Sequence, residues 1–180
     1  RQQCNLADAD SIRACVARVK PDWIINAGAW TAVDKAETER DAAFAVNADA
    51  PRLLAELAAA RGARLVHYST DYVFDGQSTR PYRPDDATSP LGTYGASKLA
   101  GEVAIRESGC RHMIFRTAWV YGNHGNNFMR TMLRVGAERE QLRVVADQFG
   151  TPTSAQLIAD VTGQVIESGS LRSGTWHLTA

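Results

Sequence analysis

The sequence predicts an α/β fold in which helices cover both faces of a doubly wound parallel sheet. Short apolar runs alternate with stretches of helical periodicity along the 180 residues, and no internal repeat or low-complexity segment interrupts the series. Short strands joined by helices form parallel sheets that are buried on both faces. The apolar fraction of 44% is ordinary for a globular protein of this size.

The first half of the chain is expected to contain a helix after Asp8, a strand at 23–27, a loop at 28–34, a helix at 39–61 and a strand at 64–69. Asp8 is a good N-cap, and apolar residues recur behind it at helical spacing until Pro21. The alanine-rich 39–61 segment tolerates Pro51 as a bend and ends at Gly62. Asp34, Lys35 and Glu37, just before it, are interpreted as a solvated helix start.

The second half continues the alternation after a polar, proline-containing loop at 75–90. The expected elements are a helix at 94–107, a strand at 112–116, a helix at 128–138, a strand at 142–145, a helix at 155–167 and a strand at 175–178. Apolar residues at helical spacing predict the helices, and short continuous apolar runs predict the strands.

Charge and cysteine usage exclude several classes of function. The 20 basic and 20 acidic residues balance, which argues against a nucleic-acid surface or a polybasic membrane patch. No apolar run approaches the roughly 20 residues that span a bilayer. Cys4, Cys15 and Cys110 lie far apart without a CxxC spacing, so we expect free thiols in a reducing cytoplasm rather than a metal or redox site. His67 is interpreted as a hydrogen-bonded core residue.

Polar side chains follow three of the predicted strands. They are Asn26-Ala27-Gly28, the segment STDYVFDG at 69–76 and Arg116-Thr117-Ala118-Trp119. Ligands of parallel sheets bind beyond the carboxyl ends of the strands, so these segments are expected to face one crevice.

Tyr94 and Lys98 supply candidate proton chemistry. They lie four residues apart on a predicted helix and therefore share a face. A nearby ammonium group is expected to lower the pKa of a tyrosine, which can then exchange a proton with a carbonyl or alcohol oxygen. By itself this spacing is a weak signal, because a helix-start aromatic residue followed by a solvated lysine shows it too.

A set of motifs covering nearly the whole chain resembles the dTDP-4-dehydrorhamnose reductase family of the extended short-chain dehydrogenase/reductase superfamily. The motifs are NAGAWTAVDKAE at 26–37, VNADAPRLLAE at 46–56, STDYVFDG at 69–76, PLGTYGASKLAGE at 90–102, RTAWVYG at 116–122 and DQFGTPT at 147–153. The resemblance implies a Rossmann-like fold and a reductase that uses NADPH or NADH on a dTDP-sugar.

The resemblance also implies roles for individual residues. Tyr94 would protonate the reduced oxygen, Lys98 would hold the nicotinamide ribose and tune Tyr94, and Thr70 would hydrogen-bond the reacting carbonyl. The implied substrate contacts are Asp71, Trp119 and Asn127, although Asp71 is also compatible with a turn cap and Trp119 with the core. The implied cofactor contacts are Asn5, Leu6, Ala29, Trp30, Thr31, Tyr68, Tyr94 and Lys98.

The sequence departs from the family pattern in two places. No Gly-rich phosphate-binding turn is present, so the chain resembles a central fragment without the first β-α unit and most of the C-terminal substrate-binding part. Residues 1–146 are expected to form the central part of a cofactor-binding domain, and 147–180 the start of a substrate-binding portion. Gln156 stands where some members have a magnesium-linked Glu, so no metal site is expected.

Several alternatives remain at this stage. A sugar-nucleotide epimerase or dehydratase of the extended family would share most of these motifs. A non-catalytic relative of the methionine adenosyltransferase regulatory-subunit type is a different class, although the presence of both Tyr94 and Lys98 argues against it. A homodimer is compatible with the family, and the choice between NADPH and NADH stays open.

Overall fold

The computed structural model describes residues 4–170 and 172–180. These residues form two compact units, described separately below. Of the described residues, unit 1 comprises 4–116 with 172–177, and unit 2 comprises 117–170 with 178–180. The chain is divided here into the parts that pack most compactly, which does not test a division by function. The functional boundary expected at 146/147 stays a prediction.

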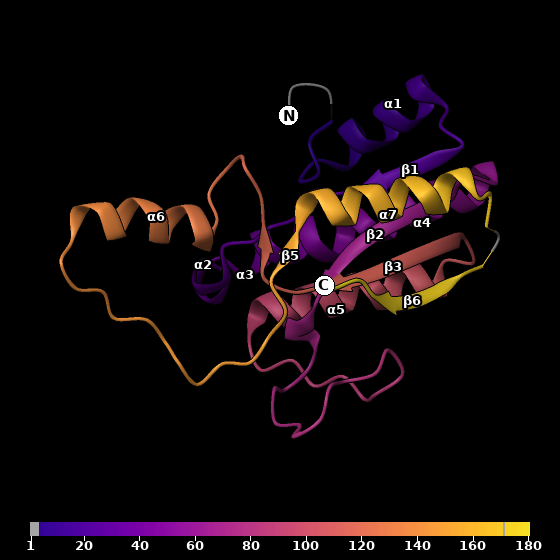
Figure 1. Cartoon of the computed structure of the whole chain (residues 1–180). Coiled ribbons are helices and arrows are strands. Elements are labelled where there is room, and N and C mark those ends of the chain that lie inside the picture. The colour runs from indigo at the N-terminus through magenta and orange to yellow at the C-terminus, as the bar shows by residue number, and fades with distance from the viewer. Residues whose placement is uncertain (1–3, 171) are drawn as a thin grey trace. The chain divides into compact units, whose positions relative to one another are not determined.

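Unit 1 is built on a four-stranded sheet with the order β1-β2-β3-β6 (Figure 1). The strands are β1 (Trp23–Asn26), β2 (Arg64–Thr70), β3 (Arg111–Thr117) and β6 (Gly174–His177). The pairs β1–β2 and β3–β6 run parallel. The prediction of an α/β fold with a parallel sheet flanked by helices is therefore confirmed.

The helices of unit 1 pack around α4 (Ala50–Arg61), which contacts β1 and β2 as well as α1 (Ala9–Val19) and α5 (Thr93–Glu107). The core between them is aliphatic, and its fully buried members include Ile12, Leu65, Ile105 and Ile114. Two sequence predictions of helix ends are confirmed. The Asp8 carboxylate caps α1, and Gly62 ends α4 in a left-handed conformation with φ 69°.

The helix predicted at 39–61 is divided into three segments. These are α3 (Arg40–Phe44), the π-helical η1 (Ala45–Asp49) and α4, while a short α2 (Val33–Thr38) occupies part of the predicted loop. Pro51 lacks the amide hydrogen that would reach the carbonyl of Asn47, and a π turn is a common way to absorb such a defect. The continuous helix was therefore wrong in detail.

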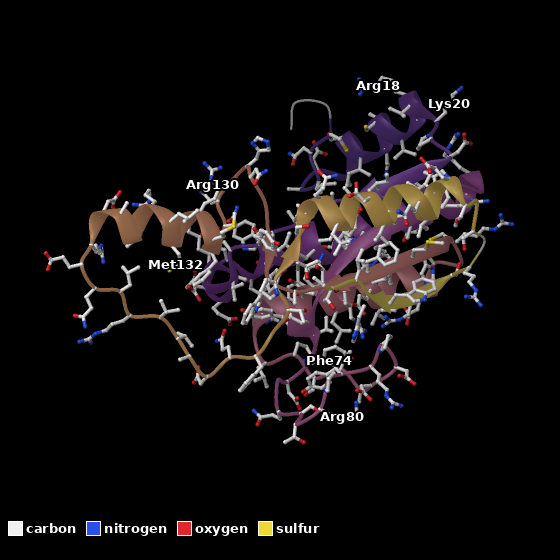
Figure 2. The ribbon with its side chains drawn as sticks, in the orientation of Figure 1. Arg18, Lys20, Phe74, Arg80, Arg130 and Met132 are labelled. Atoms are coloured by element: carbon white, nitrogen blue, oxygen red, sulfur yellow. The ribbon has the colours of Figure 1, made fainter. Side chains whose placement is uncertain are left out.

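The loop that follows the short 3₁₀ helix η2 (Asp71–Val73) is closed by a backbone bond from the Ser89 amide to the Val73 carbonyl at 2.9 Å and is further held by side chains. The rings of Phe74 and Tyr82 stack with centroids 4.3 Å apart, and Arg80 pairs with Asp86 at 2.8 Å. Figure 2 shows Phe74 and Arg80 on this loop. At its far end, the Arg116 guanidinium donates to the carbonyl of Pro84 at 3.1 Å.

Unit 2 contains the two-stranded pair β4 (Val120–Tyr121) and β5 (Thr153–Ser154), and the helices α6 (Phe128–Glu138) and α7 (Ala155–Glu167). Both helices confirm their predictions. The strand predicted at 142–145 was wrong, because this segment pairs with no other strand among the described residues. Val144 and Val145 are instead 53% and 68% exposed, and an extended segment without a paired neighbour is not a strand.

Candidate active site

Tyr94, in the first turn of α5, lies beside the end of β2, because α5 approaches η2 unusually closely. A Cβ atom at Gly95 would lie 2.2 Å from the carbonyl oxygen of Tyr72, so only glycine permits this packing. The ring of Tyr94 meets the ring of Tyr72 edge-on at 5.5 Å. The chain thereby brings the predicted proton donor next to the segment STDYVFDG.

Three of the predicted site residues lie together at the end of β2. The Thr70 hydroxyl donates to Asp71 Oδ1 at 3.0 Å and accepts from the amide of Tyr72 at 3.2 Å. The hydroxyl of Tyr94 is close enough to that of Thr70 for Thr70 to influence the Tyr94 pKa. Thr70, Asp71 and Tyr94 therefore form one cluster, and a polar group entering it meets two hydroxyls and a carboxylate.

The electrostatics of this cluster differ from the sequence-based expectation. Burial raises the pKa of Tyr94, and the Asp71 charge acts in the same direction while the bond to Thr70 opposes it. Burial likewise raises the pKa of Asp71, against the hydrogen bond from Thr70. The expected lowering of the Tyr94 pKa by Lys98 was wrong in this structure, because the Lys98 ammonium group is engaged elsewhere.

Lys98 is 2% exposed and points into the sheet. Its Nζ donates to the carbonyl of Tyr68 at 2.7 Å and lies 3.2 Å from Nε2 of His67. Burial lowers the pKa of Lys98 to about 8, and the Glu102 carboxylate partly offsets this. His67 is 1% exposed, and its other ring nitrogen contacts Asn26, so its interpretation as a hydrogen-bonded core residue is confirmed.

The loop predicted to contact the cofactor is fixed by Asn47 of η1. The Asn47 amide accepts from the backbone N–H of Trp30 at 2.9 Å and donates to the Trp30 carbonyl at 3.0 Å. It also donates to the Ser97 hydroxyl on α5 at 3.0 Å. The π-helical segment thus ties the Ala29-Trp30-Thr31 loop to the helix that carries Tyr94 and Lys98.

The other predicted cofactor contacts lie in the same unit. Leu6 packs on the loop, since a Cβ atom at Gly28 would lie 2.4 Å from its Cδ1. Asn5 is exposed, and its Oδ1 accepts from the amide of Ala7 at 3.1 Å. Tyr68 is half-buried, with its ring centroid 6.4 Å from that of Phe115. Ala29 and Thr31 are exposed.

Glu37 is more than part of a solvated helix start. Its carboxylate accepts from the amide of Thr93 at 2.7 Å and from the Thr93 hydroxyl at 2.9 Å. Both bonds act on the first residue of α5, immediately before Tyr94. Glu37 therefore fixes the start of the helix that carries the candidate proton donor, although the residue is exposed, as its interpretation as part of a solvated helix start predicted.

Trp119 and Asn127 belong to unit 2 and are described with it. Trp119 has a positive φ of 46° and is 44% exposed, so it is not a core residue. Its ring covers Gly150, where a Cβ atom would lie 2.6 Å from Cε2. Asn127 caps α6 by accepting from the amide of Arg130 at 3.1 Å, and it donates to the Gly122 carbonyl at 2.8 Å.

The part of the chain that the structure describes has neither a metal-binding cluster nor a membrane-spanning helix. It contains no group of three or more His, Cys, Asp or Glu side chains arranged to hold a metal ion. Gln156 is exposed and donates to Asp160 at 2.7 Å. Within the same residues, no helix has both the length and the apolar character needed to cross a membrane.

Sequence reasoning missed Asn47 and Ser97 as parts of this site, and although it placed Asn26 at a polar strand end, it did not predict the contact of Asn26 with His67. The signal for Asn26 was present, because a carboxamide at the end of an apolar strand is unusual, and β1–β2 register places it opposite His67. Nothing in the sequence of the 39–61 helix indicated that Asn47 would point toward the Trp30 loop. That direction follows from the π turn.

Comparison with known proteins places this geometry in a family. The dTDP-4-dehydrorhamnose reductases of Escherichia coli K12 and Burkholderia thailandensis are 46% and 45% identical in sequence to this chain, over 98% and 100% of its length. The chain covers 60% and 63% of those proteins, so it spans about three fifths of the curated relatives it matches.

Solved structures agree with this match. A crystal structure of dTDP-4-dehydrorhamnose reductase from Bacillus anthracis in complex with NADP superposes with a TM-score of 0.94 at 39% identity, over 99% of this chain and 63% of that one. Bordetella bronchiseptica WbmG with NAD and UDP, at 20% identity and a TM-score of 0.82, shares the fold. A family model for the RmlD substrate binding domain matches residues 1–180. The chain therefore belongs to the RmlD substrate binding domain family.

Proposed function

We propose that the intact protein reduces the C4 carbonyl of dTDP-4-dehydro-L-rhamnose to give dTDP-L-rhamnose, with NADPH or NADH as the reductant. The observation that carries this proposal is the cluster of Tyr94 with the hydrogen-bonded pair Thr70 and Asp71, and with Lys98 one helical turn along α5. The relatives named above supply the substrate class. The proposal assigns residues 1–146 mainly to cofactor binding and 147–180 to the start of the substrate-binding portion.

The protonation state of Tyr94 suits reduction. Because burial raises its pKa above the ordinary value of 10.0, the phenol keeps its proton at neutral pH. Tyr94 donates this proton to the oxygen that becomes the C4 hydroxyl, and Thr70 hydrogen-bonds the same oxygen beforehand. Asp71 accepts hydrogen bonds from sugar hydroxyls. Trp119 and Asn127 of unit 2 are proposed as further substrate contacts.

The residues near Lys98 fit a nicotinamide dinucleotide. An ammonium group has three protons, and Lys98 uses two contacts, to Tyr68 and His67, which leaves a third donor for a ribose hydroxyl. Tyr68 lines the nicotinamide side, and the loop from Ala29 to Thr31 follows the phosphates and ribose.

Asn5 and Leu6 would contact the adenine, and Leu6 packs on Gly28. When bound, the cofactor supplies the hydride.

The test is cofactor oxidation by the intact protein with dTDP-4-dehydro-L-rhamnose, measured with NADPH and with NADH. Tyr94→Phe is expected to lower kcat by about 10²- to 10⁴-fold, because a general acid contributes that much. Tyr82→Phe is the matched control, since Tyr82 bonds Asp75 in the 75–90 loop, and it should retain activity. A folded protein that oxidises neither cofactor would contradict the proposal and favour an epimerase or a regulatory relative.

Two finer points belong to the same proposal. We place the protein in the cytoplasm, because the reaction draws on nicotinamide cofactors and because its three cysteines are free thiols. A homodimer stays a prediction, and light scattering on the intact protein tests it.

A further inference from the structure

Lys98 belongs to a buried polar network with Asn26 and His67, and the proposed reaction assigns no role to these two partners. Asn26 on β1 and His67 on β2 stand opposite each other in the sheet register. Asn26 Nδ2 lies 3.0 Å from His67 Nδ1, and His67 Nε2 lies 3.2 Å from Lys98 Nζ. The three residues are 4%, 1% and 2% exposed, so water does not complete their hydrogen bonds. The hydrogen bonds between these three side chains must therefore be satisfied by the side chains themselves.

Counting donors and acceptors leaves two consistent states. A neutral imidazole has one N–H donor and one acceptor nitrogen. If Lys98 is an ammonium ion, it can only donate, so His67 Nε2 must accept and Nδ1 must carry the hydrogen. The Nδ1–H then needs Oδ1 of Asn26 as its acceptor, and the Asn26 amide fits the same space in either orientation.

The second state has Lys98 as a neutral amine. His67 Nε2–H then donates to the Nζ lone pair, and Nδ1 accepts from Nδ2 of Asn26, which is the amide orientation in the structure. Between the two states the network releases one proton. One proton moves from Nζ of Lys98 to Nε2 of His67, and the proton on Nδ1 of His67 is released to solvent. The side-chain amide of Asn26 flips, so that its nitrogen and oxygen exchange places.

The surrounding charges select Lys98 as the group that titrates. Burial lowers the pKa of His67 far below its usual value, and the Lys98 charge acts in the same direction, so His67 stays neutral. Burial lowers the pKa of Lys98 to about 8, with Glu102 of the same helix opposing it.

The other charged groups near α5 are engaged elsewhere. Glu37 of α2 and Arg40 of α3 both contact Thr93, and Asp71 of η2 acts on Tyr94. Glu102 itself is bound by arginines.

We propose that His67 is a positioning residue that holds Lys98 in place and changes tautomer with it, while Asn26 turns its amide to match. The link to catalysis rests on the proposed function, because that function assigns Lys98 to the cofactor. The network lets a buried lysine lose and regain a proton while the His67–Lys98 and Asn26–His67 hydrogen bonds are kept in both states. An unpaired polar atom at this depth would destabilise one of the two states.

The experiment is nitrogen NMR of the histidine rings in the intact protein, labelled with ¹⁵N, from about pH 6 to about pH 10, which spans the usual pKa values of His and Lys. His67 is expected to stay neutral throughout and to change from the Nδ1–H to the Nε2–H tautomer. The midpoint should coincide with that of the Lys98 amine, near 8. His67→Gln identifies the signals, and His112→Gln, which removes a ring bonded to the Cys110 carbonyl, is the control that should leave the Lys98 midpoint unchanged.

A second variant, Asn26→Asp, provides a fixed acceptor for Nδ1–H. It should hold His67 in the Nδ1–H tautomer and raise the Lys98 midpoint by about one pH unit or more, because it adds a negative charge. The inference is overturned if His67 becomes doubly protonated near its ordinary pKa, or if it keeps one tautomer while Lys98 titrates. The native protein alone decides this if the variants fail to fold. Since no step of the NMR needs turnover, a tautomer change in a protein without reductase activity would reject only the proposed function.

Discussion

Replacing Glu102 by Gln should remove about 3 to 5 kcal/mol from the free energy of unfolding, because it breaks a buried ion pair from one side. Glu102 is 0% exposed and Arg116 is 4% exposed. The Arg116 guanidinium donates to both carboxylate oxygens, at 2.9 Å and 2.7 Å. A glutamine puts an amide donor where one of these oxygens was, so it faces the guanidinium donor and leaves a buried positive charge unpaired.

Urea unfolding followed by circular dichroism measures this loss. With an m value of about 2 kcal/mol/M, the midpoint should fall by roughly 2 M. Asp49→Asn is the matched control, since it breaks an exposed pair with Arg52 at 3.1 Å and should cost less than about 0.5 kcal/mol. If Glu102→Gln costs no more than this control, the reasoning about the buried pair is refuted.

The same pair predicts a pH dependence. Burial alone would raise the pKa of Glu102, but the hydrogen bonds from Arg116 and its neighbours outweigh burial and lower it below 4.5. A carboxyl whose pKa is lowered by folding stabilises the native state above its unfolded pKa, and this contribution is lost as the pH falls through the lowered value. The difference between native protein and Glu102→Gln should therefore shrink below pH 4.5.

Three further predictions concern α5, α6 and α7. Gly101→Ala should cost about 1 to 3 kcal/mol in urea unfolding, since its Cβ would lie 2.2 Å from the Asn47 carbonyl oxygen, whereas Gly163→Ala, with open space around it, should gain about 0.5 to 1 kcal/mol. Lys98→Met should raise the free energy of unfolding most near neutral pH, where folding buries a charged lysine in the native protein. This gain should shrink by on the order of 3 kcal/mol between pH 8 and pH 10.5, because the native lysine is neutral there and the lysine of the unfolded chain loses its proton over that range too. Asn127→Ala should cost about 0.5 to 2 kcal/mol and speed amide exchange in the first turn of α6; unchanged exchange there would contradict its capping role.

The strands and most helices of this protein could be predicted because their signals are local. The apolar runs at 64–69 and 112–116 became β2 and β3, and the periodic segments at 94–107, 128–138 and 155–167 became α5, α6 and α7. Strand 142–145 failed for the opposite reason. Its apolar residues satisfy a local pattern, but a strand also needs a paired neighbour, which no local pattern reports.

The sequence predicted which residues form the candidate site, but it did not predict the hydrogen bonds between them. Thr70, Asp71 and Tyr94 were expected together, and they lie together, with Thr70 hydrogen-bonded to Asp71. The direction of Lys98 was not expected, since helical spacing places it on the face of Tyr94 but does not say how its flexible side chain is satisfied. Its partner His67 comes from another element, through the packing of α5 on β2.

The central claim, that this site delivers a proton to a carbonyl reduced at C4, is tested most directly by following an isotope. The intact protein is given dTDP-4-dehydro-L-rhamnose and NADPH or NADH carrying deuterium at the transferable position, and the sugar product is examined by NMR. The account predicts one deuterium, at C4, and loss of this product in Tyr94→Phe. Deuterium absent from C4, with ring hydrogens at other carbons exchanging with solvent, would contradict the account and identify an epimerase.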